Sequence, residues 1–395
     1  MRKALEGIVV LDLTRVLAGP YAAMMMADFG ANVIKIEAPK GGDDSRAFGP
    51  FVGKESLYFM SLNRGKRSMT LNLKEKKAQE LFKKMVEKAD VVLENYRPGT
   101  MEKFGLGYEE LKKINPKLIY TACSGFGHTG PYSERAAYDI IVQGMGGIMS
   151  ITGQEGGEPT RVGASVGDIT AGLFAHIGTM TALYNREVTG IGQKVDVSML
   201  DCQVAILENA ISRYTSTGIS PKPIGNRHPS ITPFEAFKSK DGYVIIAVGN
   251  DKLWATFCNL ISKPELIQDD RFITNSKRTE NQKALKVILD TVFPDKTVDE
   301  WLQVLDEAGI PSGPINTIDR VVNDVQVNFR DMIIETNHPV AGIVKMPGIP
   351  IKMSETPGAV ECPAPLLGQH TEEILKEVLG LTAAEVAELK SQKVL

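Results

Sequence analysis

Cysteine is scarce in this chain of 395 residues, and its four copies lie far apart. They are Cys123, Cys202, Cys258 and Cys362, and no two of them form a C-x-x-C pair. A structural zinc site or a disulfide framework requires closer or more regular spacing. The sequence therefore predicts a cytoplasmic protein that contains neither.

Long hydrophobic runs and an excess of positive charge are also absent. The N-terminal stretch MRKALEGIVVLDL has one short apolar run, broken by Asp12, which predicts neither a signal peptide nor a membrane span. The formal net charge is −3, which argues against nucleic acid as the main partner. The five histidines show no metal-ligand spacing, so we expect no metal site.

Strand and helix patterns alternate over the first 125 residues. The apolar runs of strand length are GIVVLDL, NVIKIEAP, SMTLNL, VVLEN and LIYTACSG. The helical segments between them are GPYAAMMMADFG, KEKKAQELFKKMVEKA and YEELKKIN. This alternation predicts an α/β fold with a mostly parallel sheet covered by helices on both faces. Ligands of such sheets bind beyond the carboxyl ends of the strands.

The composition changes near residue 220, where the proline-rich stretch SPKPIGNRHPSITP begins. After it, FEAFKSKDGYVIIAVG predicts a hairpin that turns at Asp241–Gly242. Helical patterns follow to about residue 308. We therefore predict a first part of a large domain over residues 1–224 and a smaller α+β domain over residues 225–325.

The segment GFGHTG, residues 125–130, matches G-x-G-x-x-G after a predicted strand. A dinucleotide-binding fingerprint opens a helix at once. Here Pro131 follows, and no helical pattern begins until about Tyr138. We therefore expect a loop whose glycines let backbone approach a ligand, rather than a nicotinamide site.

A single carboxylate, Asp168, lies among small and apolar residues in RVGASVGDITAGLF, residues 161–174. A helical pattern follows it, with apolar positions from Ile169 to Leu183 on one face. Aspartate is a preferred N-cap residue, so helix capping is one interpretation. Nucleophilic attack is the other, and these residues alone leave the choice open.

Eight segments together resemble class III CoA-transferases, the CaiB/BaiF family. They occur in the family's order over nearly the whole chain, at residues 10–39, 63–73, 94–111, 125–132, 137–153, 166–172, 192–201 and 364–375. The resemblance implies an interlocked homodimer, in which both ends of each chain form a large Rossmann-like domain. Residues 326–395 would then return to the large domain with the C-terminal helices.

The resemblance also implies that Asp168 is the catalytic nucleophile. A carboxylate can accept an acyl group as a mixed anhydride, and CoA thiolate can convert this anhydride to an aspartyl-CoA thioester. We expect the N-terminus of the following helix to favour the ionised form of Asp168. The implied substrates are an acyl-CoA and a small free carboxylic acid, and no cofactor would be permanently bound.

Contacts to CoA carry over from the family position by position. The first loop corresponds to Val16, Leu17 and Ala18, and a segment along the pantetheine arm to Ala136, Ala137, Tyr138 and Asp139. The adenine-facing strand end corresponds to Leu71, Asn72, Leu73 and Lys74. Near the nucleotide we expect Asn95, Tyr96 and Arg97, together with Lys103, where the family often has a phosphate-binding arginine.

Two other functions share this fold or these motifs. An α-methylacyl-CoA racemase needs paired bases on opposite faces of the substrate, with a histidine where this chain has Tyr138. A non-catalytic CoA-binding protein could retain the CoA loops, but retention of Asp168 argues against it. We therefore expect a transferase.

The identity of the carboxylic acid that accepts CoA is harder to predict. Formyl-CoA:oxalate transferases have a glutamine at the position of Leu17 and a glycine-rich lid, which this chain lacks, so oxalate and formate are disfavoured. Succinyl-CoA with a dicarboxylate, a carnitine-like acid or a 2-hydroxy acid remains. Arg227 and His228 are candidates for binding a second carboxylate.

Overall fold

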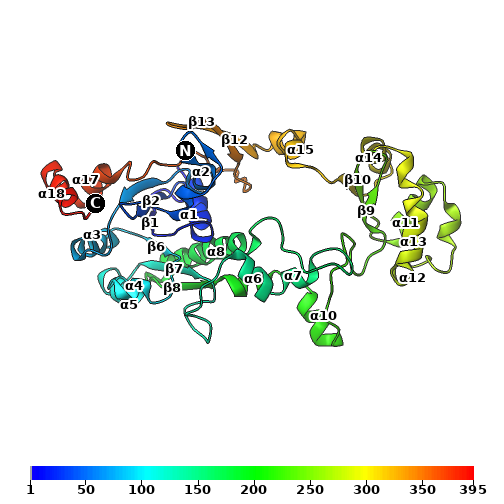
Figure 1. The fold of residues 1–395 in the computed structure, drawn as a ribbon, viewed down its shortest axis with the longest axis horizontal. Coiled ribbons are helices and arrows are strands. Elements are labelled where there is room, and N and C mark those ends of the chain that lie inside the picture. Colours follow the sequence, from blue (N-terminus) through cyan, green and yellow to red (C-terminus); the bar gives the residue numbers. More distant parts are fainter. Residues whose placement is uncertain (1) are drawn as a thin grey trace. The chain divides into compact units, whose positions relative to one another are not determined.

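The computed structural model describes residues 2–395 and contains a six-stranded parallel sheet (Figure 1). Its strands lie in the order β5-β2-β1-β6-β7-β8, and every neighbouring pair is parallel. Their bounds are β1 Val9–Asp12, β2 Asn32–Glu37, β5 Arg67–Thr70, β6 Val91–Glu94, β7 Ile119–Ser124 and β8 Lys194–Ser198. The predicted parallel sheet is therefore confirmed.

The order of the strands reverses between β1 and β6. From β1 the chain builds outward through β2 and β5, and β6, β7 and β8 then extend the sheet on the other side. The loops that leave the carboxyl ends of β1 and β6 consequently diverge and leave a crevice between them. Ligands of open parallel sheets bind at such a crevice, and residues 13–17 and 95–99 border it here.

Two apolar layers cover the sheet. On one face the strands pack against α3 (Lys76–Val86), α5 (Tyr108–Ile114), α17 (Thr371–Leu379) and α18 (Ala383–Ser391). On the other face they pack against α1 (Ala18–Asp28) and α8 (Val166–Thr189). The C-terminal helices thus lie beside the N-terminal strands, as Figure 1 shows.

The remaining sheets are small and antiparallel. The hairpin of β9 (Phe234–Lys238) and β10 (Tyr243–Ala247) turns as predicted and pairs with β11 (Ser312–Pro314). The hairpin of β12 (Ile333–His338) and β13 (Gly342–Pro347) follows later in the chain, and β3 (Phe51–Val52) pairs with β4 (Glu55–Ser56). The fold is therefore mixed α/β.

The other helices are short. In the first half of the chain they are η1 Asp44–Ala47, α2 Leu57–Asn63, α4 Thr100–Lys103, α6 Asp139–Met145 and α7 Ile148–Ile151. Further along are α9 Met199–Ala205, α10 Ala210–Thr217, α11 Asp251–Leu260, η2 Pro264–Ile267, α12 Asn275–Glu280, α13 Gln282–Asp290, η3 Phe293–Asp295, α14 Val298–Glu307, α15 Ile318–Val322 and α16 Val325–Phe329. Within residues 2–395, no helix has both the length and the apolarity needed to cross a bilayer.

The chain divides into two compact units. The first comprises the chain up to Ile148, Arg161–Ser212 and Gln326–Leu395, and the second comprises Met149–Thr160 and Arg213–Val325. Residues 149–160 and 213–224, predicted above as part of the large domain, therefore belong to the second unit. One reason is a backbone hydrogen bond of 2.9 Å from Gly225 to Gly153, a long-range contact that no local pattern reveals.

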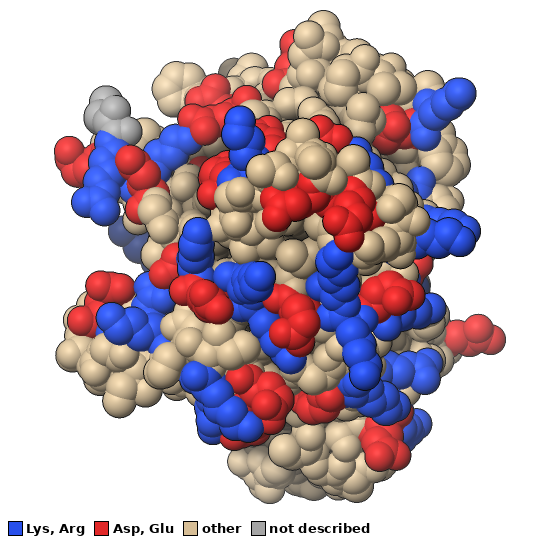
Figure 2. Space-filling view, turned by 90° about the vertical axis from the view of Figure 1, so that its left-hand side faces the viewer, with Lys and Arg blue, Asp and Glu red and all other residues tan. Residues whose placement is uncertain are grey.

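Charges of both signs alternate on the face that carries α17 and α18 (Figure 2). Arg67 pairs there with Glu373 and Glu377, and Lys390 pairs with Glu372. Neither sign forms a broad patch on the face that Figure 2 shows.

Candidate active site

A cavity of about 410 Å³ lies at the predicted crevice and contains Asp168. Its wall is formed by the loop after β1, the loop after β6 and the end of β7 with the segment that follows. A second cavity of about 680 Å³ adjoins it, since Arg15, Asp44, Tyr96 and Tyr138 line both. The two cavities together lie beyond the carboxyl ends of the strands.

Most residues assigned from the family resemblance lie in these cavities. Those that line the first cavity together with Asp168 are Val16, Leu17, Ala18, Asn95, Tyr96, Arg97, Ala136, Ala137 and Tyr138. Lys74 lines the second cavity. The structure thus brings together residues as distant in the chain as Val16 and Asp168, which are 152 positions apart.

Five assigned residues line neither cavity. Leu71 and Leu73 are buried in the core, and the side chain of Asn72 bonds to the backbone of Lys393 and Lys74. Lys103 is exposed on α4, and the carboxylate of Asp139 is bonded to protein donors. Their proposed contacts to CoA stay predictions.

Two arginines that the sequence patterns did not indicate, Arg15 and Arg135, also line the first cavity. Arg15 pairs with Asp44, whereas the guanidinium of Arg135 lies over the rings of Phe126 and Tyr132. The position of Arg15 directly after the first strand was a usable signal, because ligands bind beyond strand ends. The sequence around Arg135 contained no comparable signal.

Asp168 is not the N-cap of its helix. Helix α8 begins at Val166 with Ser165 as N-cap, so Asp168 occupies the third helical position. The carboxylate of Asp139 instead caps this turn, since its Oδ1 accepts the N–H of Gly167 at 2.9 Å. The capping interpretation is therefore wrong.

Asp139 forms the support beneath Asp168. Its second oxygen accepts a hydrogen bond of 2.8 Å from Gln143 and one of 3.2 Å from Arg161. Gln143 in turn accepts the N–H of Val162 at 2.9 Å. These contacts fix the first turn of α8 and the segment that leads into it.

The carboxylate of Asp168 is half-buried, and no donor within residues 2–395 forms a hydrogen bond with it. Burial, and to a smaller extent the negative charge of Asp139, together raise the pKa of Asp168 to about 7. The helix N-terminus is expected to favour the ionised form, but burial acts in the opposite direction, and the net shift of the Asp168 pKa is upward. An ionised carboxylate of high pKa is a stronger nucleophile than an ordinary aspartate.

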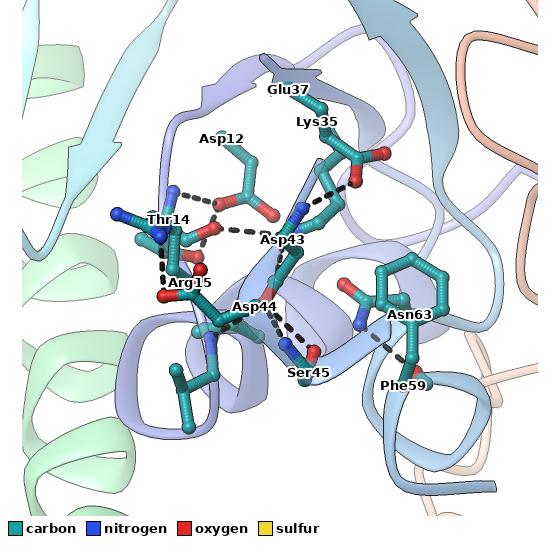
Figure 3. A network of polar contacts seen from close by, with 12 residues as sticks. Asp12, Thr14, Arg15, Lys35, Glu37, Asp43, Asp44, Ser45, Phe59 and Asn63 are labelled. Atoms are coloured by element: carbon teal, nitrogen blue, oxygen red, sulfur yellow. Dashed lines mark hydrogen bonds and ion pairs between the residues drawn. The ribbon is translucent and has the colours of Figure 1, made fainter. Parts of the chain in front are cut away.

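The loop after β1 rests on buried charges (Figure 3). Lys35 lies 2.9 Å from Asp43 and donates a hydrogen bond of 2.8 Å to the carbonyl of Thr14. Asn95 exchanges two hydrogen bonds of 2.8 Å with the backbone of Arg15 and so joins the loops after β1 and β6. Both loops of the crevice are thus held rigidly.

Within the described range 2–395, no group of three or more His, Cys, Asp or Glu side chains is arranged to hold a metal. All four cysteines are free, and Cys123, Cys202 and Cys258 are buried. Burial raises the pKa of the Cys123 thiol, which lines the cavity, so this group is a poor nucleophile at neutral pH.

In this parallel α/β sheet, a carboxylate that accepts no hydrogen bond from residues 2–395 lies in a cavity at the switch point, an arrangement that suits acyl transfer. Comparisons with known proteins identify the family. Residues 5–371 match the profile of CoA-transferase family III. The chain is 43% identical over 388 residues to a mouse succinyl-CoA:glutarate CoA-transferase, an alignment that covers 98% of this chain and 89% of that protein.

Two further relatives extend this picture. An acetyl-CoA:oxalate CoA-transferase of Acetobacter aceti is 46% identical over 361 residues, which cover 90% of this chain and 92% of that protein. The crystal structure of a CaiB/BaiF family protein from Brucella suis matches with a TM-score of 0.86 and 41% identity over 96% of this chain and all of that one. The chain therefore belongs to CoA-transferase family III and is a class III CoA-transferase.

Proposed function

We propose that this enzyme transfers CoA from a short acyl-CoA such as succinyl-CoA to a free dicarboxylic acid, with Asp168 as the nucleophile. The observation that carries this proposal is the carboxylate of Asp168. It lies in a cavity at the switch point, has a raised pKa, and is bonded to no protein donor within residues 2–395. Such a group is available to attack a substrate.

The reaction proceeds through two carboxyl intermediates. The carboxylate of Asp168 attacks the thioester carbon, the carbon–sulfur bond breaks, and CoA thiolate leaves behind a mixed anhydride. The thiolate attacks the Asp168 carbonyl of this anhydride and releases the first acid, which gives an aspartyl-CoA thioester. The second acid repeats these steps in reverse and leaves as its CoA thioester, so that Asp168 is regenerated.

Water must be excluded because it hydrolyses both intermediates. Apolar side chains around Asp168 support this requirement, since Val16, Leu17, Ala137 and Met199 line the same cavity. We assign the acyl-pantetheine arm to this cavity and the nucleotide to the adjoining one. The second cavity offers two lysines, Lys40 and Lys74, for phosphate groups.

The proposed acceptor is a dicarboxylic acid because the acids named for the two curated relatives, glutarate and oxalate, both carry two carboxyl groups. The relative named for oxalate also restores oxalate as a candidate, although Leu17 and the missing lid disfavoured it. Arg227 lies 3.8 Å from Glu155 within the second unit, so its role in binding a second carboxylate stays a prediction.

We further propose that a second copy of this chain covers an apolar stripe on α8. Leu173, Ile177, Tyr184 and Val188 are exposed and recur at spacings of four and seven residues, which places them on one helix face. Contiguous exposed apolar surface is typical of an interface. This stripe supports the interlocked homodimer that the family resemblance implies.

The same proposal includes a cytoplasmic enzyme without a permanently bound cofactor, and without nucleic acid or a membrane as partner. Two observations support these points. The cysteines are free, and the formal net charge of −3 gives the protein no general attraction to polyanions such as nucleic acids.

The covalent route is tested by trapping. Incubation with succinyl-CoA, a rapid quench and hydroxylamine should give a hydroxamate on one peptide, and tandem mass spectrometry should locate it at Asp168. In parallel, a panel of glutarate, oxalate, carnitine and lactate as acceptors should show the fastest CoA transfer to a dicarboxylate. A hydroxamate at Asp44, the other carboxylate in the cavity wall, or no adduct on any carboxyl group, contradicts the assignment.

The raised pKa of Asp168 predicts the pH dependence. Because only the carboxylate attacks, kcat/KM for the acyl-CoA should fall about 100-fold from pH 8 to pH 5, with an inflection near pH 7. An aspartate with the ordinary pKa of 3.8 would lose almost nothing over this range. Initial rates measured from pH 5 to 9, with circular dichroism to verify folding, decide between the two profiles.

A further inference from the structure

Four fully buried charged residues lie beneath the loop after β1: Asp12, Lys35, Asp43 and Lys66, here called the buried ion cluster. Lys66 lies 2.9 Å from Asp12, and Lys35 lies 2.9 Å from Asp43. Figure 3 shows Asp12, Lys35 and Asp43 converging on the backbone around Thr14 and Arg15. Buried ion pairs often add little stability compared with apolar side chains of similar volume, so stability alone does not account for this cluster.

Asp43 connects the cluster to the active-site loop. Its Oδ1 accepts the N–H of Val16 at 3.0 Å, and also the N–H and hydroxyl of Ser45 at 2.9 and 2.8 Å. Its other oxygen faces the ammonium group of Lys35. The side chain thus joins the loop after β1 to the segment after β2, 27 positions away.

Val16 is held in a strained conformation. Its φ of 68° lies in the left-handed region, which a β-branched residue rarely adopts. A residue in such a region costs on the order of 1–3 kcal/mol and persists only where its surroundings impose it. Here the restraints are Asp43 on the N–H of Val16 and Asn95 on both backbone groups of Arg15.

The strained residue directly precedes the start of α1. Leu17 is the N-cap of α1, and the N–H groups of Leu17 and Ala18 donate to no acceptor in the part of the chain that the structure describes. Both residues line the cavity that contains Asp168. Free N–H groups at this position can stabilise negative charge that develops on a reacting carbonyl oxygen.

We infer that Asp43, paired with Lys35, is a positioning residue: it keeps Val16 in the left-handed conformation and so directs the N–H groups of Leu17 and Ala18 toward the reacting carbonyl. This inference rests on the proposed role of Asp168 as nucleophile. Asp43 itself touches no reacting atom and acts only through the backbone of Val16. Loss of Asp43 should therefore slow the chemical step more than it weakens binding of acyl-CoA.

The test combines Asp43→Ala with a rescue by Val16→Gly. Asp43→Ala should lower kcat about 100-fold, as loss of an oriented oxyanion donor does, while KM for succinyl-CoA changes less than about threefold. Glycine adopts positive φ without strain, so the double variant Asp43→Ala, Val16→Gly should recover at least about tenfold in kcat. A merely structural role of Asp43 predicts no such recovery.

The matched control is Asp28→Ala. Asp28 forms a similarly buried pair with Arg64, at 2.8 Å, but at the other end of α1. This variant should be destabilised and yet keep kcat within about threefold of wild type, since Asp28 supports no loop of the site. Equal losses of kcat in Asp43→Ala and Asp28→Ala, or no recovery with Val16→Gly, overturn the inference.

Hydrogen exchange separates this inference from the proposed function. Asp43→Asn loses the charge that faces Lys35 but is more conservative, so it serves where Asp43→Ala does not fold. In Asp43→Asn the peptide spanning residues 14–18 should exchange faster than in wild type, whereas Asp28→Asn should leave it unchanged. Unchanged exchange in Asp43→Asn refutes the positioning role, while a wild-type enzyme that gives no adduct at Asp168 refutes the nucleophile alone.

Discussion

Asp168→Ala and Asp168→Asn are expected to lower the rate of CoA transfer by at least about 10⁴-fold, the scale of losses when a covalent nucleophile is removed. Neither a methyl group nor an amide can form the mixed anhydride. The measurement is CoA transfer from succinyl-CoA to glutarate, followed by chromatography of the product thioesters. Near wild-type transfer by either purified variant would show that Asp168 is not the nucleophile.

Measurements of the free energy of unfolding test whether the Asp168 variants lose activity because they unfold. The pKa of Asp168 is about 7 in the folded protein, whereas an ordinary aspartate has a pKa of 3.8. The unfolded chain therefore loses this proton at lower pH than the folded protein does, and the free energy of unfolding falls as the pH rises from 4 to 7. Asp168→Asn removes this decrease. The variant should therefore be more stable than wild type at pH 8 and equally stable below pH 4, with activity absent throughout.

Asp201→Asn is the matched control for the effect of removing a negative charge from the first turn of a helix. Asp201 also lies in the first turn of a helix, α9, but it is exposed and lines neither cavity. This substitution should leave both transfer activity and the pH profile unchanged. A loss of activity in Asp201→Asn comparable to that in Asp168→Asn would mean that charge at a helix start, rather than the nucleophile, is being measured.

Asp12→Ala is expected to lower the free energy of unfolding by about 3–5 kcal/mol, because it leaves a buried ammonium group without its counter-charge. Lys66 is fully buried, and besides Asp12 it bonds only to the carbonyl of Pro20 and the side chain of Asn63, within residues 2–395. Asp12 also accepts the N–H and the hydroxyl of Thr14. Urea denaturation followed by circular dichroism gives the free energy directly.

Glu110→Ala is the control for this stability experiment. Glu110 pairs with Lys113 on α5, but both side chains are exposed, and exposed pairs contribute little. No change in the denaturation midpoint is expected. If Asp12→Ala behaves like Glu110→Ala, then the buried ion cluster does not contribute to folding in the way its burial indicates.

The sequence by itself determined the parallel sheet. Apolar runs of strand length alternate with amphipathic helices. This pattern depends only on residues that are close together in the chain, so it can be recognised without the tertiary structure. The strands β1, β2, β5, β6 and β7 follow from it. Very short strands such as β3 and β4 escaped prediction, because two residues carry no periodicity.

The position of Asp168 within its helix was decided only by the tertiary structure. Sequence preference suggested an N-cap aspartate, but the side chain that caps α8 comes from Asp139, 28 positions before the Gly167 whose N–H it accepts. The carboxylate of Asp168 accepts no hydrogen bond from a donor in residues 2–395, and its burial raises its pKa. N-cap preferences consider only residues next to the helix in the sequence, so they cannot identify a capping side chain as distant in the chain as Asp139.

The geometry of the loop after β1 was likewise decided by tertiary structure. The sequence identified Val16, Leu17 and Ala18 only through a family resemblance, and nothing local to Val16 indicates a positive φ. That conformation depends on Asp43, Lys35 and Asn95, which reach the loop from the segments around β2 and after β6. A sequence specifies which charges are available, but burial and pairing arise only when strands distant in the chain lie side by side.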